Sequence, residues 1–290
     1  MEDGHDVQPY CRTLGAVTLG VRWRPRRKRL MLVTGMTGFL GKHLVEASEL
    51  GDWELLSPSR AQLDVRDRKR VLDEITTWTP NVVVHLAHRR DDRETTVEGS
   101  RHVAQAAAAA GSRLIHLSTD LVFAGRERPY TEHDQPDAHW QYGEWKAAAE
   151  QTVLHAGGSS LIVRTSLLYG TDYQASIQRD VAAAVAGRSD MRFFTDEFRC
   201  PAHADDVATA IVALADRPAI TGVLHVAGPR AISRAELAGI FAERIGGHRS
   251  QLATCSSRES GLNRPTKVLL DSSAAAGLGI HCRPIEEALR

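Results

Sequence analysis

The stretch that decides the fold reads Leu30-Met31-Leu32-Val33-Thr34-Gly35-Met36-Thr37-Gly38-Phe39-Leu40-Gly41. It opens with four apolar residues, 30–33, a length typical of a buried parallel strand. The apolar run breaks into Gly35-x-x-Gly38-x-x-Gly41, after which apolar residues return at helical spacing. A strand, a glycine-rich turn and a helix in this order predict a turn that binds a dinucleotide.

Each glycine has its own task in such a turn. Gly35 permits a tight exit from the strand, and Gly38 lets the backbone approach a pyrophosphate. Gly41 lets the helix lie close to the sheet, and the helix start offers unpaired N–H groups to phosphate. We therefore expect the residues at the start of this turn and helix to bind the cofactor: Gly35, Thr37, Gly38, Phe39 and Leu40.

Length and charge narrow the class of protein. A chain of 290 residues can hold one large α/β domain with a small additional lobe. Its 36 basic residues balance 36 acidic ones, so we expect neither nucleic acid nor an anionic membrane as a partner. No apolar run approaches the roughly 20 residues of a membrane span. The four cysteines are scattered and form no metal-ligand pair, which indicates reduced thiols, no metal site and a cytoplasmic protein.

Residues 1–27 differ from the rest of the chain and lead into a basic run, residues 22–29. A basic arm that binds polyanions is one interpretation of this extension. The composition favours the other, a solvated and poorly ordered extension.

Strand-like and helix-like segments alternate along the remaining chain. We expect further strands at residues 53–56, 82–87, 113–118, 161–164, 191–194 and 223–226. Helices are expected between them at residues 67–78, 97–110, 142–155, 177–186, 205–215 and 234–245. This alternation predicts a doubly wound parallel sheet of the Rossmann type.

The end of the second expected strand bears on the choice of cofactor. It reads Ser57-Pro58-Ser59-Arg60, where a protein that binds NAD usually has an acidic residue for the ribose 2′-hydroxyl. Without that carboxylate, Arg60 is placed to pair with a 2′-phosphate, which favours NADPH over NADH. The alternative is that Arg60 is a surface residue in a loop.

Acid–base chemistry is indicated by Tyr142 and Lys146, which lie one helical turn apart. An ammonium near the phenol lowers the tyrosine pKa from about 10 towards neutrality. Thr119 ends the fourth expected strand, where its hydroxyl can orient a substrate oxygen. Alone, Thr119 is equally typical of a capping turn, and the Tyr–Lys pair of an exposed helix contact. Together with the glycine turn, the three residues predict a catalytic site.

These motifs carry a family resemblance. Gly35-x-x-Gly38-x-x-Gly41 with Tyr142-x-x-x-Lys146 resembles the extended short-chain dehydrogenase/reductase family. Within it, the segments at 118–123, 142–146 and 164–170 are similar to those of dTDP-4-dehydrorhamnose reductases, and the likeness extends from residue 28 to the C-terminus. Further similar segments are Leu63-Asp64-Val65, residues 222–228, Arg264-Pro265 and Leu270-Asp271.

The resemblance implies NADPH-dependent reduction of a 4-keto-6-deoxy nucleotide-sugar, and it leaves a homodimer open. It implies a dinucleotide-binding domain of residues 28–171 and 199–227, with a substrate-binding lobe of residues 172–198 and 228–290. The additional cofactor contacts that it implies are Asp64, Val65, Leu86, Ala87, Tyr142 and Lys146. The implied substrate contacts are His88, Phe123, Trp140 and Arg199. For Arg199, a salt bridge to Asp196 or Glu197 is the alternative interpretation.

The chain also departs from the family pattern. Leu121 stands where many relatives have an aromatic residue, Thr96 stands near an expected asparagine, and His85-Leu86-Ala87-His88 replaces an Asn-Ala-Ala run. These changes keep two other functions open. One is a nucleotide-sugar epimerase or dehydratase, and the other is a cofactor-binding regulatory protein similar to the regulatory subunit of methionine adenosyltransferase. The presence of both Tyr142 and Lys146 favours an enzyme.

Overall fold

A parallel sheet forms the centre of the protein. The computed structural model describes residues 29–49, 51–172, 174–261 and 265–290, so the expected basic extension lies outside the described residues. Within the described residues, the main sheet has six strands in the order β10-β5-β4-β3-β1-β2. All neighbouring strands are parallel, which confirms the doubly wound sheet. The strands are β1 (Arg29–Thr34), β2 (Trp53–Leu56), β3 (Val82–His85), β4 (Arg113–Thr119), β5 (Ser160–Thr165) and β10 (Gly222–His225).

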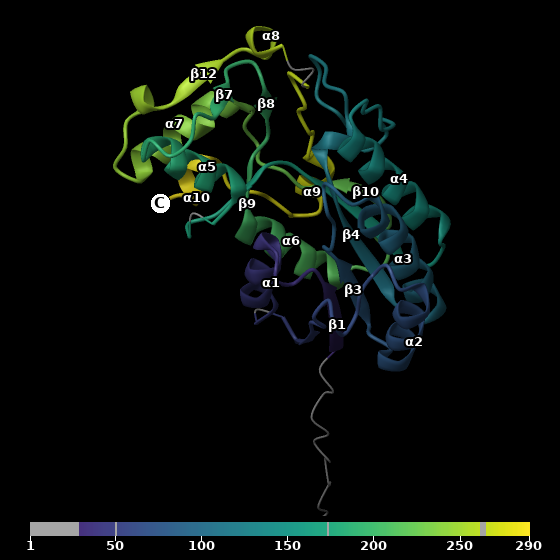
Figure 1. Ribbon diagram of the computed structural model, residues 1–290. Helices are drawn as coiled ribbons and strands as arrows, with labels where there is room; N and C mark the ends of the chain where they lie inside the picture. The colour runs from purple at the N-terminus through teal and green to yellow at the C-terminus, as the bar shows by residue number, and fades with distance from the viewer. Residues whose placement is uncertain (1–28, 50, 173, 262–264) are drawn as a thin grey trace, which may run out of the picture.

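Helices cover both faces of this sheet (Figure 1). On one face lie α1 (Phe39–Glu49) and α6 (Ala204–Ala215), and on the other lie α2 (Arg68–Trp78), α3 (Gly99–Ala109) and α4 (Gln141–His155). Because successive side chains of a strand point to opposite faces, Met31 and Val33 enter the core beneath α1 and α6, whereas Leu32 enters the other core. Burial on both faces explains why the strand sequences are almost entirely apolar.

The strand order reverses between β1 and β3. The chain leaves β1 through α1 to β2 on one side of it, and returns through α2 to β3 on its other side. The loops that follow β1 and β3 therefore diverge at the carboxyl edge of the sheet. In open α/β sheets such a point opens a crevice for ligands.

A second lobe with its own core lies beyond this edge (Figure 1). Its core joins buried residues of α5 (Ser176–Val185), β7 (Arg192–Phe194), α7 (Arg234–Arg244) and α10 (Ile285–Ala288). β12 (Ala253–Cys255) pairs with β7, and two further two-stranded ladders join β6 (Leu168–Tyr169) to β9 (Ala202–His203) and β8 (Phe198–Arg199) to β11 (Ile232–Ser233). This part of the chain also has the short helices α8 (Ser257–Ser260) and α9 (Ser273–Gly277) and a 3₁₀ turn, Arg249–Gln251.

The expected elements are present, with differences at their ends. The helix expected from residue 97 begins earlier, as a π-helical turn Glu94–Glu98 that continues into α3. The strand expected over 82–87 stops at His85, because the next residues turn into the crevice. No helix of the described part is long and apolar enough to cross a membrane.

Candidate active site

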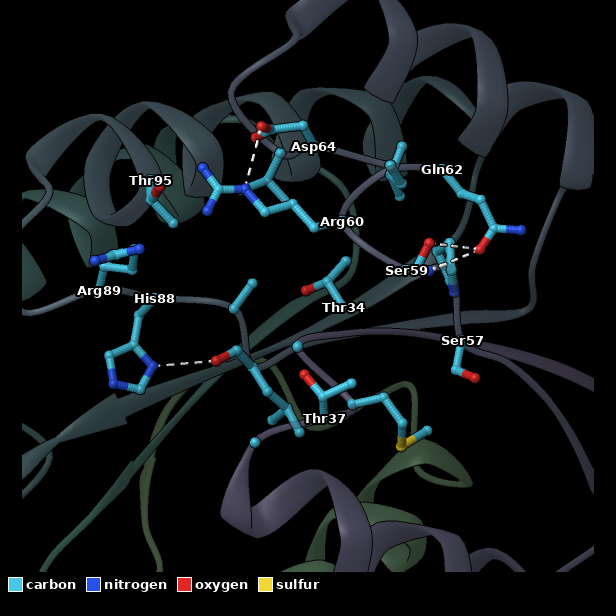
Figure 2. A pocket seen from close by; sticks show the side chains of 18 residues that line it. Thr34, Thr37, Ser57, Ser59, Arg60, Gln62, Asp64, His88, Arg89 and Thr95 are labelled. Atoms are coloured by element: carbon cyan, nitrogen blue, oxygen red, sulfur yellow. Dashed lines mark hydrogen bonds and ion pairs between the residues drawn. The ribbon is translucent and has the colours of Figure 1, made fainter. Parts of the chain in front are cut away.

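A cavity of about 420 Å³ opens where the loops after β1 and β3 diverge (Figure 2). Its walls come from the glycine turn after β1, the segment after β2 and the loop after β3. The lining residues are Thr34, Gly35, Met36, Thr37, Gly38, Ser57, Pro58, Ser59, Arg60, Gln62, Leu63, Asp64, Val65, Leu86, Ala87, His88, Arg89 and Thr95. Eight predicted cofactor residues are in this set: Gly35, Thr37, Gly38, Arg60, Asp64, Val65, Leu86 and Ala87.

The glycine turn forms one end of the cavity. Gly35 has a φ of 77°, and a Cβ there would lie 2.7 Å from the backbone nitrogen of Ala87, so only glycine fits between the two loops. Gly41 is required for a reason other than the close approach of helix to sheet that we expected. A Cβ on Gly41 would lie 2.2 Å from the carbonyl oxygen of Met36, so the glycine closes the turn onto the helix rather than bringing the helix to the sheet.

The segment after β2 forms the opposite end. The Ser59 N–H and hydroxyl both donate to Gln62 Oε1 at 2.9 Å. Arg60 is half exposed and its Nε lies 3.4 Å from Asp64 Oδ2 (Figure 2). Arg66 donates to the same carboxylate through Nη2 at 2.7 Å and holds the pKa of Asp64 well below its usual range. Among the described lining residues Asp64 is the one carboxylate, and its charge is already matched, so this end suits an anion.

Four predicted cofactor residues lie outside the lining set: Phe39, Leu40, Tyr142 and Lys146. The Leu40 side chain is buried in the core beneath α1, and the Phe39 ring packs edge-on against His43 with centroids 4.8 Å apart. Only their backbone groups at the start of α1 are left for a phosphate. Conversely, sequence reasoning missed Ser57, Ser59, Gln62, Arg89 and Thr95. The position of Ser57 and Ser59 at a strand end was the signal for those two.

Lys146 is buried beneath the start of α4. It is 3 % exposed, and its Nζ donates to the carbonyl oxygen of Leu117 at 2.7 Å and lies 3.2 Å from His116 Nε2. Burial lowers the pKa of Lys146 to about 8. The ammonium is therefore held by β4.

Tyr142 lies one turn earlier on α4, beside the loop that follows β3. Its ring centroid is 6.0 Å from that of His88, and the guanidinium carbon of Arg90 lies 5.4 Å from it. Burial raises the pKa of Tyr142 to about 12, and Arg90 acts in the opposite direction. Our expectation that Lys146 lowers this pKa is wrong for this structure, because desolvation of the phenol dominates.

Thr119 ends β4 and begins a 3₁₀ turn, Asp120–Val122. Its hydroxyl donates to Asp120 Oδ1 at 3.2 Å and accepts from the Leu121 N–H at 3.2 Å. Thr119 thus has the capping role that we kept as an alternative. Because its side chain is only half-buried, a second role towards a substrate stays a prediction.

The four predicted substrate contacts have different surroundings. His88 is exposed at the cavity mouth, and Trp140 is half-buried with its indole N–H donating to the Leu121 carbonyl at 3.0 Å. Phe123 is fully buried and stacks on Tyr130 at 3.9 Å, so the structure corrects the expectation that its ring faces a substrate. Arg199 is also corrected: it is 1 % exposed and donates to Glu197 Oε1 at 3.0 Å, which was the alternative interpretation.

The fold and the site together define a class. A doubly wound sheet with a glycine-turn cavity at its switch point and a tyrosine–lysine pair on the neighbouring helix is the arrangement of a short-chain dehydrogenase or reductase. The model of the family described as "RmlD substrate binding domain" matches residues 28–290. The chain therefore belongs to that family. The predicted resemblance to dTDP-4-dehydrorhamnose reductases is confirmed.

Relatives of two kinds are similar to the chain. Methionine adenosyltransferase 2 subunit beta of Bos taurus is 30 % identical over 282 residues, which cover 87 % of this chain and 83 % of that protein. The dTDP-4-dehydrorhamnose reductase of Mycobacterium tuberculosis is 31 % identical over 250 residues, which cover 80 % of this chain and 81 % of the reductase. A crystal structure of the Bacillus anthracis dTDP-4-dehydrorhamnose reductase in complex with NADP aligns with a TM-score of 0.82 at 25 % identity, covering 91 % of this chain and 98 % of that one.

Proposed function

We propose that this protein is an NADPH-dependent reductase of a 4-keto-6-deoxy nucleotide-sugar. The observation that carries the proposal is the continuity of the site. The cavity runs from Arg60 after β2, past the glycine turn, to His88, and the ring of His88 neighbours the ring of Tyr142. The reductases of Mycobacterium tuberculosis and Bacillus anthracis support the substrate class through their similarity to the chain.

The cavity suits a dinucleotide that carries a 2′-phosphate. Gly35 and Gly38 line the cavity without side chains of their own, so a pyrophosphate can approach the backbone and the start of α1 there. Arg60 borders the opposite end, beside a carboxylate that Arg66 already neutralises. When bound, NADPH supplies the hydride that reduces a carbonyl carbon.

The protein's own part in the reaction is to hold and release a proton. With a pKa of about 12, Tyr142 keeps its proton at neutral pH and can give it to the carbonyl oxygen as that oxygen gains charge. Thr119 has a hydroxyl at the end of the adjoining strand with which to orient the oxygen. Lys146, one turn further along α4, is a predicted contact to the cofactor.

The remaining predictions belong to the same proposal. Residues 172–198 and 228–290, which include most of the second core, would bind the nucleotide-sugar. His88 and Trp140 are the predicted substrate contacts that are accessible in the structure. We place the enzyme in the cytoplasm, and sedimentation at several concentrations would decide between a monomer and a homodimer.

A panel of 4-keto-6-deoxy nucleotide-sugars tests the proposal. Purified protein with NADPH should lose the absorbance of the reduced cofactor with a matching member of the panel and release the reduced sugar. An epimerase or dehydratase would instead convert its sugar with no net cofactor oxidation. Binding of NADPH without any conversion would contradict an enzymatic function.

The similarity to methionine adenosyltransferase 2 subunit beta favours a second candidate, a regulatory protein that binds NADP. That function requires a stable complex with a methionine adenosyltransferase catalytic subunit. Mixing the two proteins and measuring both complex formation and adenosyltransferase kinetics separates the candidates. The reductase proposal predicts no change in those kinetics.

A further inference from the structure

Arg90 is the cation that lies beside the predicted catalytic tyrosine. It is exposed in the loop after β3, two residues beyond His88. Its guanidinium carbon lies over the Tyr142 ring, 5.4 Å from the ring centre, where its positive charge favours ionisation of the phenol. A cation at this distance from an aromatic ring is attracted to its face.

Neighbouring arginines of the same segment are engaged elsewhere. Arg89 pairs with Asp91 at 3.1 Å, and Arg93 pairs with Glu98 at 3.1 Å. In the part of the chain that the structure describes, no carboxylate is paired with Arg90. Its charge is therefore available to the phenol.

The other charged or ionisable groups near Tyr142 leave the stabilisation of its phenolate to Arg90. Asp120, from the turn after β4, opposes ionisation of the phenol. His88, from the same loop as Arg90, faces the ring at 6.0 Å. Lys146, on the same helix as Tyr142, donates to the Leu117 carbonyl and contacts His116, so its ammonium is directed towards β4.

We propose that Arg90 is a positioning residue that stabilises the phenolate of Tyr142, the role that the tyrosine–lysine spacing assigned to Lys146. The inference rests on the proposed function for the direction of proton transfer. In that step the Tyr142 O–H bond breaks, the proton joins the carbonyl oxygen, and a hydride from NADPH joins the carbonyl carbon. The negative charge left on the phenolate is then stabilised by the guanidinium, which lies over the same ring.

A titration of Tyr142 tests the inference without any substrate. Protein labelled with 3-fluorotyrosine, whose phenol ionises at lower pH than that of tyrosine, is followed by fluorine NMR, and Tyr142→Phe assigns the resonance. Arg90→Gln should raise the pKa of residue 142 by about one unit, a tenfold loss in its ionisation constant. Arg90→Lys should restore most of that loss.

Arg93→Gln is the matched control, because it removes an exposed arginine three residues away that pairs with Glu98. It should leave the titration of residue 142 unchanged. An unchanged titration in Arg90→Gln, with NADPH affinity and circular dichroism intact, overturns the inference. Since the measurement needs no turnover, a silent substrate panel beside a shifted titration would reject the proposed substrate and leave the role of Arg90 standing.

Discussion

Burial shifts the two central ionisable groups in opposite directions. Removing a phenol or an ammonium from water disfavours its charged form, which raises the pKa of Tyr142 to about 12 and lowers that of Lys146 to about 8. A charge on Lys146 would offset the shift of Tyr142 only if the ammonium faced the phenol. Instead its hydrogen bonds go to Leu117 and His116, so desolvation decides both values.

The lysine gives the enzyme a pH dependence. Because the folded pKa of Lys146 lies below its ordinary value, the ammonium is present below about pH 8 and is lost as the pH rises through that value. Tyr142 does not titrate in this window. We therefore expect kcat/KM for NADPH, which reports the free enzyme, to fall above about pH 8.

The variant Lys146→Met tests whether deprotonation of Lys146 causes this fall in kcat/KM. The variant should be less active throughout and should lack the fall above pH 8. A fall of the same size and midpoint in the methionine variant would assign it to another residue.

The strand–turn–helix at the start of the sheet was fully predictable from the sequence. An apolar run and three spaced glycines sufficed, because the backbone needs of that turn allow few other residues. The short ladders β6–β9 and β8–β11 could not be predicted from the sequence, because two-residue strands show no periodicity and form only when distant segments meet. The burial of Phe123 was missed for a similar reason: Arg164, which lies over its ring, and Val268 and Leu270 of the same core are far along the chain.

The segment after β2 should decide cofactor choice. Replacing Arg60 with alanine removes a charge-assisted contact to a 2′-phosphate, a contact worth about 1.5–3 kcal/mol. The ratio of NADPH to NADH affinity should therefore fall roughly ten- to hundredfold, as measured by calorimetric titration of both cofactors.

Lys69→Ala is the control for this variant, because Lys69 is an exposed cation on α2 that pairs with Asp73 outside the cavity. It should leave the ratio unchanged. An equal ratio in Arg60→Ala and the native protein would make Arg60 a surface residue without a role in selectivity.

A buried ion network joins the sheet to the second lobe. Arg199 of β8 lies 3.0 Å from Glu197 and 3.5 Å from Asp120, and Asp120 also accepts from the Ser166 hydroxyl at 2.6 Å. Asp120 directly follows Thr119, so the network also fixes the turn that holds this predicted catalytic residue. Stability and site geometry are coupled here.

Loss of the guanidinium should destabilise the whole molecule. Arg199→Met removes the cation beside buried Asp120 and leaves Glu197 with only the more distant Arg234, at 3.8 Å, of the cations paired with it here, so we expect the free energy of unfolding in urea to fall by roughly 3–5 kcal/mol. The exposed Arg192→Met is the control and should change it little. If Arg199→Met kept native stability but lost nucleotide-sugar affinity, Arg199 would be a substrate contact after all.

The central claim is that the protein reduces a nucleotide-sugar ketone with Tyr142 as the acid. The most direct measurement compares turnover of a 4-keto-6-deoxy nucleotide-sugar with NADPH by the native protein and by Tyr142→Phe. Removing a positioned acid typically costs about 10²- to 10⁴-fold, so kcat should fall by that factor while NADPH affinity is retained. Equal turnover by the two proteins would contradict the claim.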